Sequence, residues 1–174
     1  MPVSTGAAAS GARSHDPALF AWPESSADGG AGRCRPGHYV GTYSCAVRNA
    51  QWAGDAGLII PIDGPVDLVL NEGQNGEFLT VSGGTLKSAA AGFFQLSGDV
   101  TGQLDCATGV FSGQVAMGEV SIPPLPPGGT FTATMNGALD STNQSLSGTW
   151  RLTGGTTLQD WWCTGPWKVS YQGP

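Results

Sequence analysis

The sequence predicts an all-β domain, an antiparallel up-and-down meander of about eight strands in which a barrel is favoured over a sandwich. Three observations predict it: helical periodicity is nearly absent, apolar and polar residues alternate with period two, and a strand–turn–strand motif occurs twice. The motif spans 102–113 and returns thirty-five residues later at 137–148, each time with Leu-Asp before the polar turn. A repeated hairpin with its own turn chemistry is typical of barrels and sandwiches.

The composition divides the chain of 174 residues near Cys34. Residues 1–33 are mostly Ala, Gly, Ser, Asp and Pro, which bury too little apolar surface to offset the entropy of ordering, so we expect a disordered tail or linker. The apolar cluster at 19–22 leaves open a short segment that docks on the domain or on a partner. Residues 34–174 are long enough to enclose one core and form the predicted β domain.

Alternation identifies the strands in order. In 39–47 most odd positions are large or apolar and the even ones include Thr42 and Ser44, which indicates a strand with one wet face. The apolar run 58–62 contains Pro61, which favours an edge or a bend. The later strands are expected at 94–104, 131–139, 146–152 and 161–171.

Turn residues separate these runs. We expect turns at 63–65, 71–76 and 83–84, and a stiff proline-rich loop at 121–129 that joins the two repeats. Asp105 and Asp140 occupy equivalent positions of the two repeats, which favours side-chain capping of the turns.

The charge pattern excludes one class of partner. Charged residues make up 11% of the chain, and the net charge is −6. Because phosphate backbones require a cationic stripe, we expect no nucleic-acid partner. No apolar stretch is long enough for a transmembrane helix. The neutral, Gly/Ser/Thr-rich composition is typical of secreted and cell-surface β proteins.

The four cysteines indicate disulfides, since their spacing does not fit a zinc site. If the first and last strands close the sheet, Cys45 and Cys163 lie near one end, while Cys34 and Cys106 lie near the other. Of the three possible pairings we therefore predict Cys45 with Cys163 and Cys34 with Cys106.

Disulfides imply an oxidising compartment, so we expect an extracellular, periplasmic or cell-surface location. The first residues show no signal peptide. A lost leader, another export route and a reduced cytoplasmic protein remain alternatives.

A catalytic apparatus is not evident. His15 and His38 lie in no metal-ligand or Ser/His/Asp context, and the acidic residues are scattered over turns. We expect no enzyme activity, no cofactor and no metal site.

Tryptophans offer the better candidates for a binding site. Because Trp161 and Trp162 are adjacent, they point to opposite faces of a strand. One interpretation has Trp150, Trp161 and Trp167 in the core and Trp162 over a surface groove. The other is an aromatic pocket wall for a sugar or small ligand.

The segment Trp150-Arg-Leu152-Thr-Gly-Gly-Thr-Thr-Leu-Gln-Asp-Trp161 resembles the penultimate strand, loop and tryptophan of avidin-type biotin-binding barrels, and 41–43 resembles the start of their first strand. The resemblance covers about twenty residues and implies an eight-stranded up-and-down barrel with Trp150, Leu152 and Trp161 as pocket-wall positions. It departs at the biotin contacts, because the first-strand Asn aligns with Cys45 and the final-strand Asp has no counterpart near Trp167.

Two function classes follow. The first is a non-catalytic structural or protein-interaction module outside the cell or at its surface, which binds a protein or glycan there or associates with itself. The alternative is a small-ligand or glycan-binding barrel with Trp150, Leu152, Trp161 and Trp162 at its site.

Overall fold

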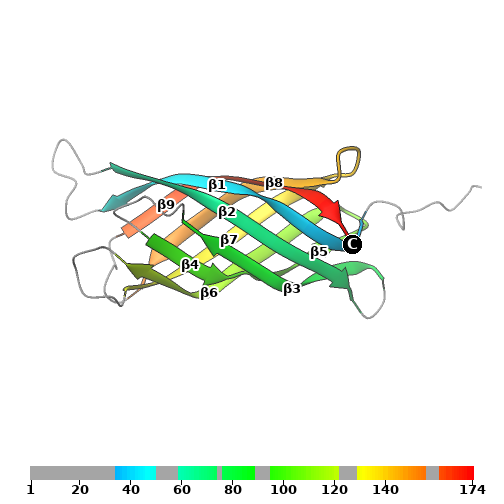
Figure 1. Ribbon diagram of the computed structural model, residues 1–174, viewed down its shortest axis with the longest axis horizontal. Coiled ribbons are helices and arrows are strands. Elements are labelled where there is room, and N and C mark those ends of the chain that lie inside the picture. Colours follow the sequence, from blue (N-terminus) through cyan, green and yellow to red (C-terminus); the bar gives the residue numbers. More distant parts are fainter. Residues whose placement is uncertain (1–33, 50–58, 74–75, 89–94, 122–128, 156–160) are drawn as a thin grey trace, which may run out of the picture.

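The computed structural model describes residues 34–49, 59–73, 76–88, 95–121, 129–155 and 161–174, and their fold is all-β, as predicted (Figure 1). The expectation for 1–33 lies outside the described residues. No helix in the described part is long and apolar enough to cross a membrane. The strands are β1 (Gly37–Asn49), β2 (Ile59–Glu72), β3 (Phe78–Lys87), β4 (Gln95–Asp99), β5 (Thr101–Asp105), β6 (Val110–Ser121), β7 (Gly129–Asp140), β8 (Ser145–Gly154) and β9 (Trp161–Gly173).

The sheet closes into a barrel. Apart from β4 and β5, strands that follow one another in the chain lie side by side and antiparallel, and β1 pairs with β9 to close the circle. β4 and β5 lie in line, because both pair with β3 on one side and with β6 on the other. The nine strands of the described residues therefore fill eight positions, and the predicted up-and-down barrel is confirmed.

The run expected at 94–104 is two strands rather than one. The interruption is at Val100, whose N–H still donates to the Gly84 carbonyl at 2.9 Å. A short break that keeps this cross-strand bond lets the strand bend without opening the barrel wall.

Two expected turns are wrong. Residues 63–65 lie inside β2, and 83–84 lie inside β3. Gly83 lies opposite Val69 and Val81 lies opposite Leu70, so Ser82 is the extra residue of a β-bulge that adjoins the two glycines. The prediction failed because glycine and proline serve both turns and irregular strand positions.

The prolines of β2 are tolerated for a reason that the sequence indicated. Pairing of β2 with β3 begins at Val66, whereas the segment before it, which includes Pro61 and Pro65, pairs with β1. On its β3 side, this part of β2 has no strand partner, so the N–H groups that the prolines lack would have made no hydrogen bonds between strands there.

Inward-facing side chains fill the barrel. Trp150, Trp167, Tyr39, Tyr43 and Phe111 are among the largest side chains that are almost fully buried. Tyr43 meets Trp150 edge to face with ring centroids 4.7 Å apart, and Phe111 meets Trp167 in the same way at 5.3 Å. The interior is a packed aromatic and aliphatic core.

Glycines make room for this core and for close approach of strands. A Cβ on Gly118 would collide with the Phe131 ring, and a Cβ on Gly148 would collide with the backbone of Asn136. Gly118 thus accommodates a ring inside the barrel, while Gly148 allows β7 and β8 to approach closely.

The two ends of the barrel differ. At one end, which we call the turn end, the connections are short, at 73–77, 106–109 and 141–144, and Pro174 lies there (Figure 1). At the opposite end, the loop end, the connections 50–58, 88–94, 122–128 and 155–160 are longer.

Both predicted disulfides are present. Cys34 is bonded to Cys106 at the turn end, and Cys45 is bonded to Cys163 nearer the loop end. The reasoning from topology was correct because nearest-neighbour connections fix which end of the barrel each strand terminus occupies.

The Asp-led turns are also confirmed. Asp105 Oδ1 accepts hydrogen bonds from the N–H groups of Ala107 and Thr108, at 2.8 and 3.0 Å. Asp140 Oδ1 accepts from Thr142 and Asn143 in the same way, at 3.0 and 3.3 Å. The sequence repeat is thus a repeat of turn chemistry.

Candidate functional site

The four predicted ligand-binding residues do not lie on one surface. Trp150 and Leu152 are each 1% exposed and belong to the core. Trp161 is half-buried and packs against that core. Trp162 faces outward and is 40% exposed. Period-two alternation separates the adjacent tryptophans as expected, and it also prevents a joint site.

The polar groups of the core tryptophans are already used. Trp150 Nε1 donates to the Ser44 carbonyl at 3.2 Å, and Trp167 Nε1 donates to the carbonyls of Asn136 and Thr149 at 3.2 Å. These hydrogen bonds hold both rings in the core and leave neither indole N–H for a ligand.

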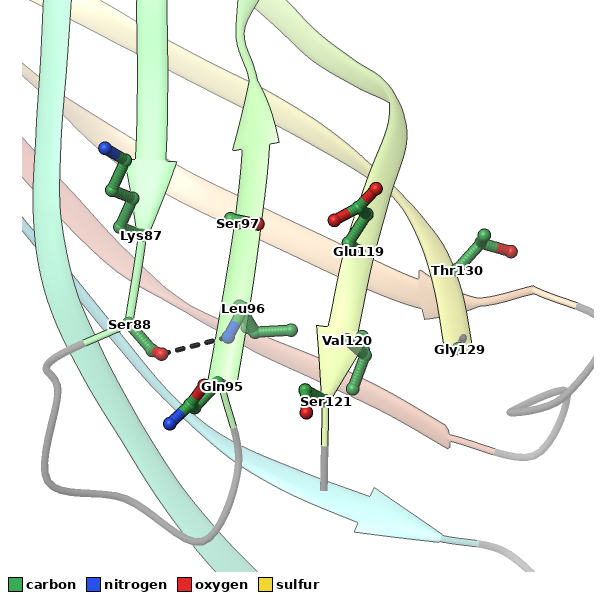
Figure 2. A pocket seen from close by; sticks show the side chains of 10 residues that line it. All are labelled: Lys87, Ser88, Gln95, Leu96, Ser97, Glu119, Val120, Ser121, Gly129 and Thr130. Atoms are coloured by element: carbon green, nitrogen blue, oxygen red, sulfur yellow. Dashed lines mark hydrogen bonds between the residues drawn. The ribbon is translucent and has the colours of Figure 1, made fainter. Parts of the chain in front are cut away.

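A polar depression lies on the barrel wall at the loop end. It has a volume of about 580 Å³ and spans the ends of β3, β4, β6 and β7 (Figure 2). Its lining residues are Lys87, Ser88, Gln95, Leu96, Ser97, Glu119, Val120, Ser121, Gly129 and Thr130.

Strand register builds the centre of this depression. Ser97 on β4 lies between Lys87 on β3 and Glu119 on β6, and pairs with both. Glu119 in turn lies opposite Thr130 on β7. We call these four residues the polar row. Neighbouring strands are about 4.8 Å apart, so the Cα atoms of Lys87 and Glu119 are separated by about 10 Å with a serine between them.

The polar row offers both charges to one ligand. Lys87, Ser97 and Glu119 are exposed, and Figure 2 shows them on successive strands. Below them the rim is held by the Leu96 N–H, which donates to Ser88 Oγ at 2.9 Å. The row can donate from an ammonium group, accept at a carboxylate and exchange hydrogen bonds with hydroxyl groups.

A second hollow, of about 670 Å³, lies across β2, β1, β9 and β8. Its lining includes Asp63, Lys168, Thr42, Ser44 and Thr149. It too combines unlike charges with hydroxyl groups, but it lies along the middle of the strands rather than at the loop end.

The pKa shifts occur in the core and in the turns. Burial raises the pKa of Tyr43, and the charge of Asp63 raises it further. The pKa of Asp105 is lowered chiefly by the hydrogen bond from the Thr108 backbone, and that of Asp140 by the hydrogen bond from the Asn143 side chain. These shifts follow from packing and from turn capping.

His38, for which the sequence indicated no metal-binding or catalytic role, pairs with a carboxylate on the neighbouring strand. His38 lies in β1, and its Nε2 is 2.6 Å from Asp67 Oδ1 on β2, with both side chains close to half exposed. An exposed pair of this kind contributes little to stability. The described residues contain no cluster of three metal-ligating side chains.

Sequence reasoning missed the polar row. Net charge gives no reason to single out Lys87, and Glu119 belongs to the acidic residues that were expected in turns, although it lies inside β6. The signal that joins them is cross-strand register, which depends on the turns and on the bulge in β3 and cannot be read from one strand.

No protein-family model matches this chain, and no curated protein shows significant sequence similarity to it. The residues and the geometry therefore carry the functional argument by themselves.

Proposed function

We propose that this protein is a non-catalytic β-barrel module that binds a protein partner through its outer surface at the loop end. The observation that carries the proposal is the filled interior. Among the described residues, twenty-five hydrophobic side chains form one buried core, and the two tryptophans with bonded N–H groups belong to it. A binding surface must therefore lie on the outside.

The loop end is the favoured surface for two reasons. Its connections are longer than those of the turn end, and binding residues in proteins concentrate on longer loops carried by a rigid scaffold. It also bears the polar row, in which a lysine and a glutamate flank a serine. Such a pattern favours a partner that presents the complementary pair of charges.

The two disulfides support a location outside the reducing cytoplasm. They link Cys34 with Cys106 and Cys45 with Cys163. Because glutathione and thioredoxin keep cytosolic thiols reduced, this arrangement favours an extracellular, periplasmic or cell-surface site of action.

The experiment is site-specific photocrosslinking of the full chain in its native cells. A benzophenone amino acid replaces Ser97, which is exposed in the polar row on β4, and in a second protein replaces Gln103, exposed on β5 toward the turn end. We expect a discrete adduct from position 97 and none from position 103. Adducts of equal yield at the two positions, or none at either, would contradict binding at the loop end.

A second candidate function is recognition of a glycan at the same depression. The observation that favours it is the lining itself, in which Gln95, Ser97, Ser121 and Thr130 supply amide and hydroxyl groups beside Glu119. We expect calorimetric titration with a panel of neutral oligosaccharides to give saturable heat that Glu119→Gln weakens. The absence of heat from every member would reject the glycan and leave the protein partner.

A further inference from the structure

An exposed aromatic and basic patch lies on the outer wall at the loop end, away from the polar row. Arg48 on β1 lies opposite Ile59 on β2 and opposite Trp162 on β9, so the three side chains are neighbours across three strands. Ile59 is 56% exposed and Trp162 is 40% exposed. We call these three residues the Trp162 patch.

The patch has the chemistry of an interface centre. The Arg48 guanidinium lies 5.6 Å from the centroid of the Trp162 ring, a cation–π arrangement that holds the ring against the wall. Arg151 on β8 is also exposed. It lies beside the patch, because its partner on β9, Thr164, is two residues from Trp162. Tryptophan and arginine are the residues most enriched at binding hot spots, and apolar area beside them is buried when a partner docks.

The chain itself contains a segment that matches this patch. Within 1–33 the main cluster of apolar side chains is Leu19-Phe20-Ala21-Trp22, with Asp16 before and Glu24 after the cluster. An apolar segment with acidic flanks is complementary to an apolar patch with arginine flanks, both in burial and in charge.

The Cys34–Cys106 disulfide determines which copy of the barrel such a segment reaches. It holds the start of the domain at the turn end, whereas the Trp162 patch lies at the loop end. From Gly37 to Arg48 the strand β1 rises about 36 Å. Trp22 precedes Cys34 by twelve positions. A chain of that length reaches at most about 40 Å, and a flexible chain of that length spans about 20 Å on average.

Docking within one molecule therefore demands an almost fully stretched tail, while a second molecule can approach to meet a relaxed one. We propose that residues 19–22 of one copy dock on the Trp162 patch of a second copy of this chain. The inference does not depend on the proposed function, because it uses a different face of the barrel.

The contact is heterologous, since a tail meets a patch rather than another tail. Each copy has one tail at the turn end and one patch at the loop end, so a docked copy still offers a free tail and a free patch. Unless a ring closes, copies add head to tail into chains. The barrel then acts as the repeating unit of the assembly.

Sedimentation equilibrium of the oxidised full chain tests the proposal. We expect the average mass of the native protein to rise with concentration. Trp162→Thr, and separately the double variant Phe20→Ser/Trp22→Ser, should weaken association at least about tenfold. Met117→Thr is the matched control, because Met117 is an apolar side chain 77% exposed elsewhere on the wall, and it should associate as the native chain does.

Mixing gives the sharper result. The Trp162→Thr copy retains its tail, and the Phe20→Ser/Trp22→Ser copy retains its patch, so an equimolar mixture has one intact pair of surfaces. We expect the mixture to form dimers and nothing larger at a concentration where each variant alone is monomeric. A native chain that stays monomeric at every concentration, or association that survives Trp162→Thr, would overturn the proposal.

Discussion

Replacing Cys45 and Cys163 by alanine removes one cross-link and leaves the other, which allows its contribution to stability to be worked from the structure. The disulfides interleave along the chain, with sequence separations of 72 for Cys34–Cys106 and 118 for Cys45–Cys163. With the first bond intact, the shortest covalent path between positions 45 and 163 runs through it and includes about 70 residues, well below the direct separation.

Closing a loop of that size lowers the free energy of the native state relative to the unfolded chain by about 4 kcal/mol. When Cys34–Cys106 is removed instead, positions 34 and 106 remain connected through Cys45–Cys163 by a path of about 70 residues. The two double alanine variants should therefore lose similar amounts of stability despite the different direct separations. Each variant also loses one buried sulfur, that of Cys163 or that of Cys106, which adds roughly 1 kcal/mol to both losses.

The assay is urea unfolding of the full chain in oxidising buffer, followed by tryptophan fluorescence, with the free energy of unfolding extrapolated to water. The Cys34→Ala/Cys106→Ala protein is the matched control for the Cys45→Ala/Cys163→Ala protein. A loss below about 1 kcal/mol in either variant, or losses that differ between the two variants by more than about 1 kcal/mol, would refute the reasoning.

The remaining predictions concern single side chains. Tyr43→Phe removes a buried hydroxyl that has no hydrogen-bond partner among the described residues, so it should leave the free energy of unfolding unchanged or raise it by up to about 1 kcal/mol, and a clear loss in urea unfolding would contradict this. Gly148→Ala forces a Cβ into the backbone of Asn136 and should cost about 2 kcal/mol in the same assay, whereas Gly83→Ala meets only ordinary contacts and should be near neutral. Asp140→Ala removes a turn cap and should lower the melting temperature by a few degrees at neutral pH. The Asn143 side-chain amide and the backbone N–H groups of the turn lower the pKa of Asp140, so its contribution to stability is present above its ordinary pKa and is lost as the pH falls through the lowered value. The melting temperatures of the variant and the native protein should therefore converge in acid. A difference that stays constant down to that pH would argue against the cap.

Local chemistry made much of the fold predictable. Alternation of side chains is a property of any extended strand, so the run 39–47 already identified the strand that the structure extends to Gly37–Asn49. Asp105 and Asp140 bind the N–H groups of the turns that follow them, and such contacts need no distant partner. The disulfides followed because an up-and-down order assigns each strand terminus to an end.

Glycines that lie inside strands could not be distinguished from turn residues in the same way. Position 64 lies inside β2 and requires a glycine, because a Cβ there would collide with the backbone of Lys87 on the neighbouring strand. Gly84 is crowded by Val100 in the same manner. A glycine that allows close approach and a glycine that allows a turn are identical in sequence, and the neighbouring strand decides between them.

The candidate site depended still more on tertiary structure. The sequence by itself determined an all-β meander, its capped turns, its cysteine pairs and the opposite directions of Trp161 and Trp162, since each follows from spacing along one chain. Only the closed barrel decided that Trp150 is core, that Lys87, Ser97 and Glu119 form one row, and that Arg48 lies over Trp162. Those neighbours come from different strands, and register, bulges and closure bring them together.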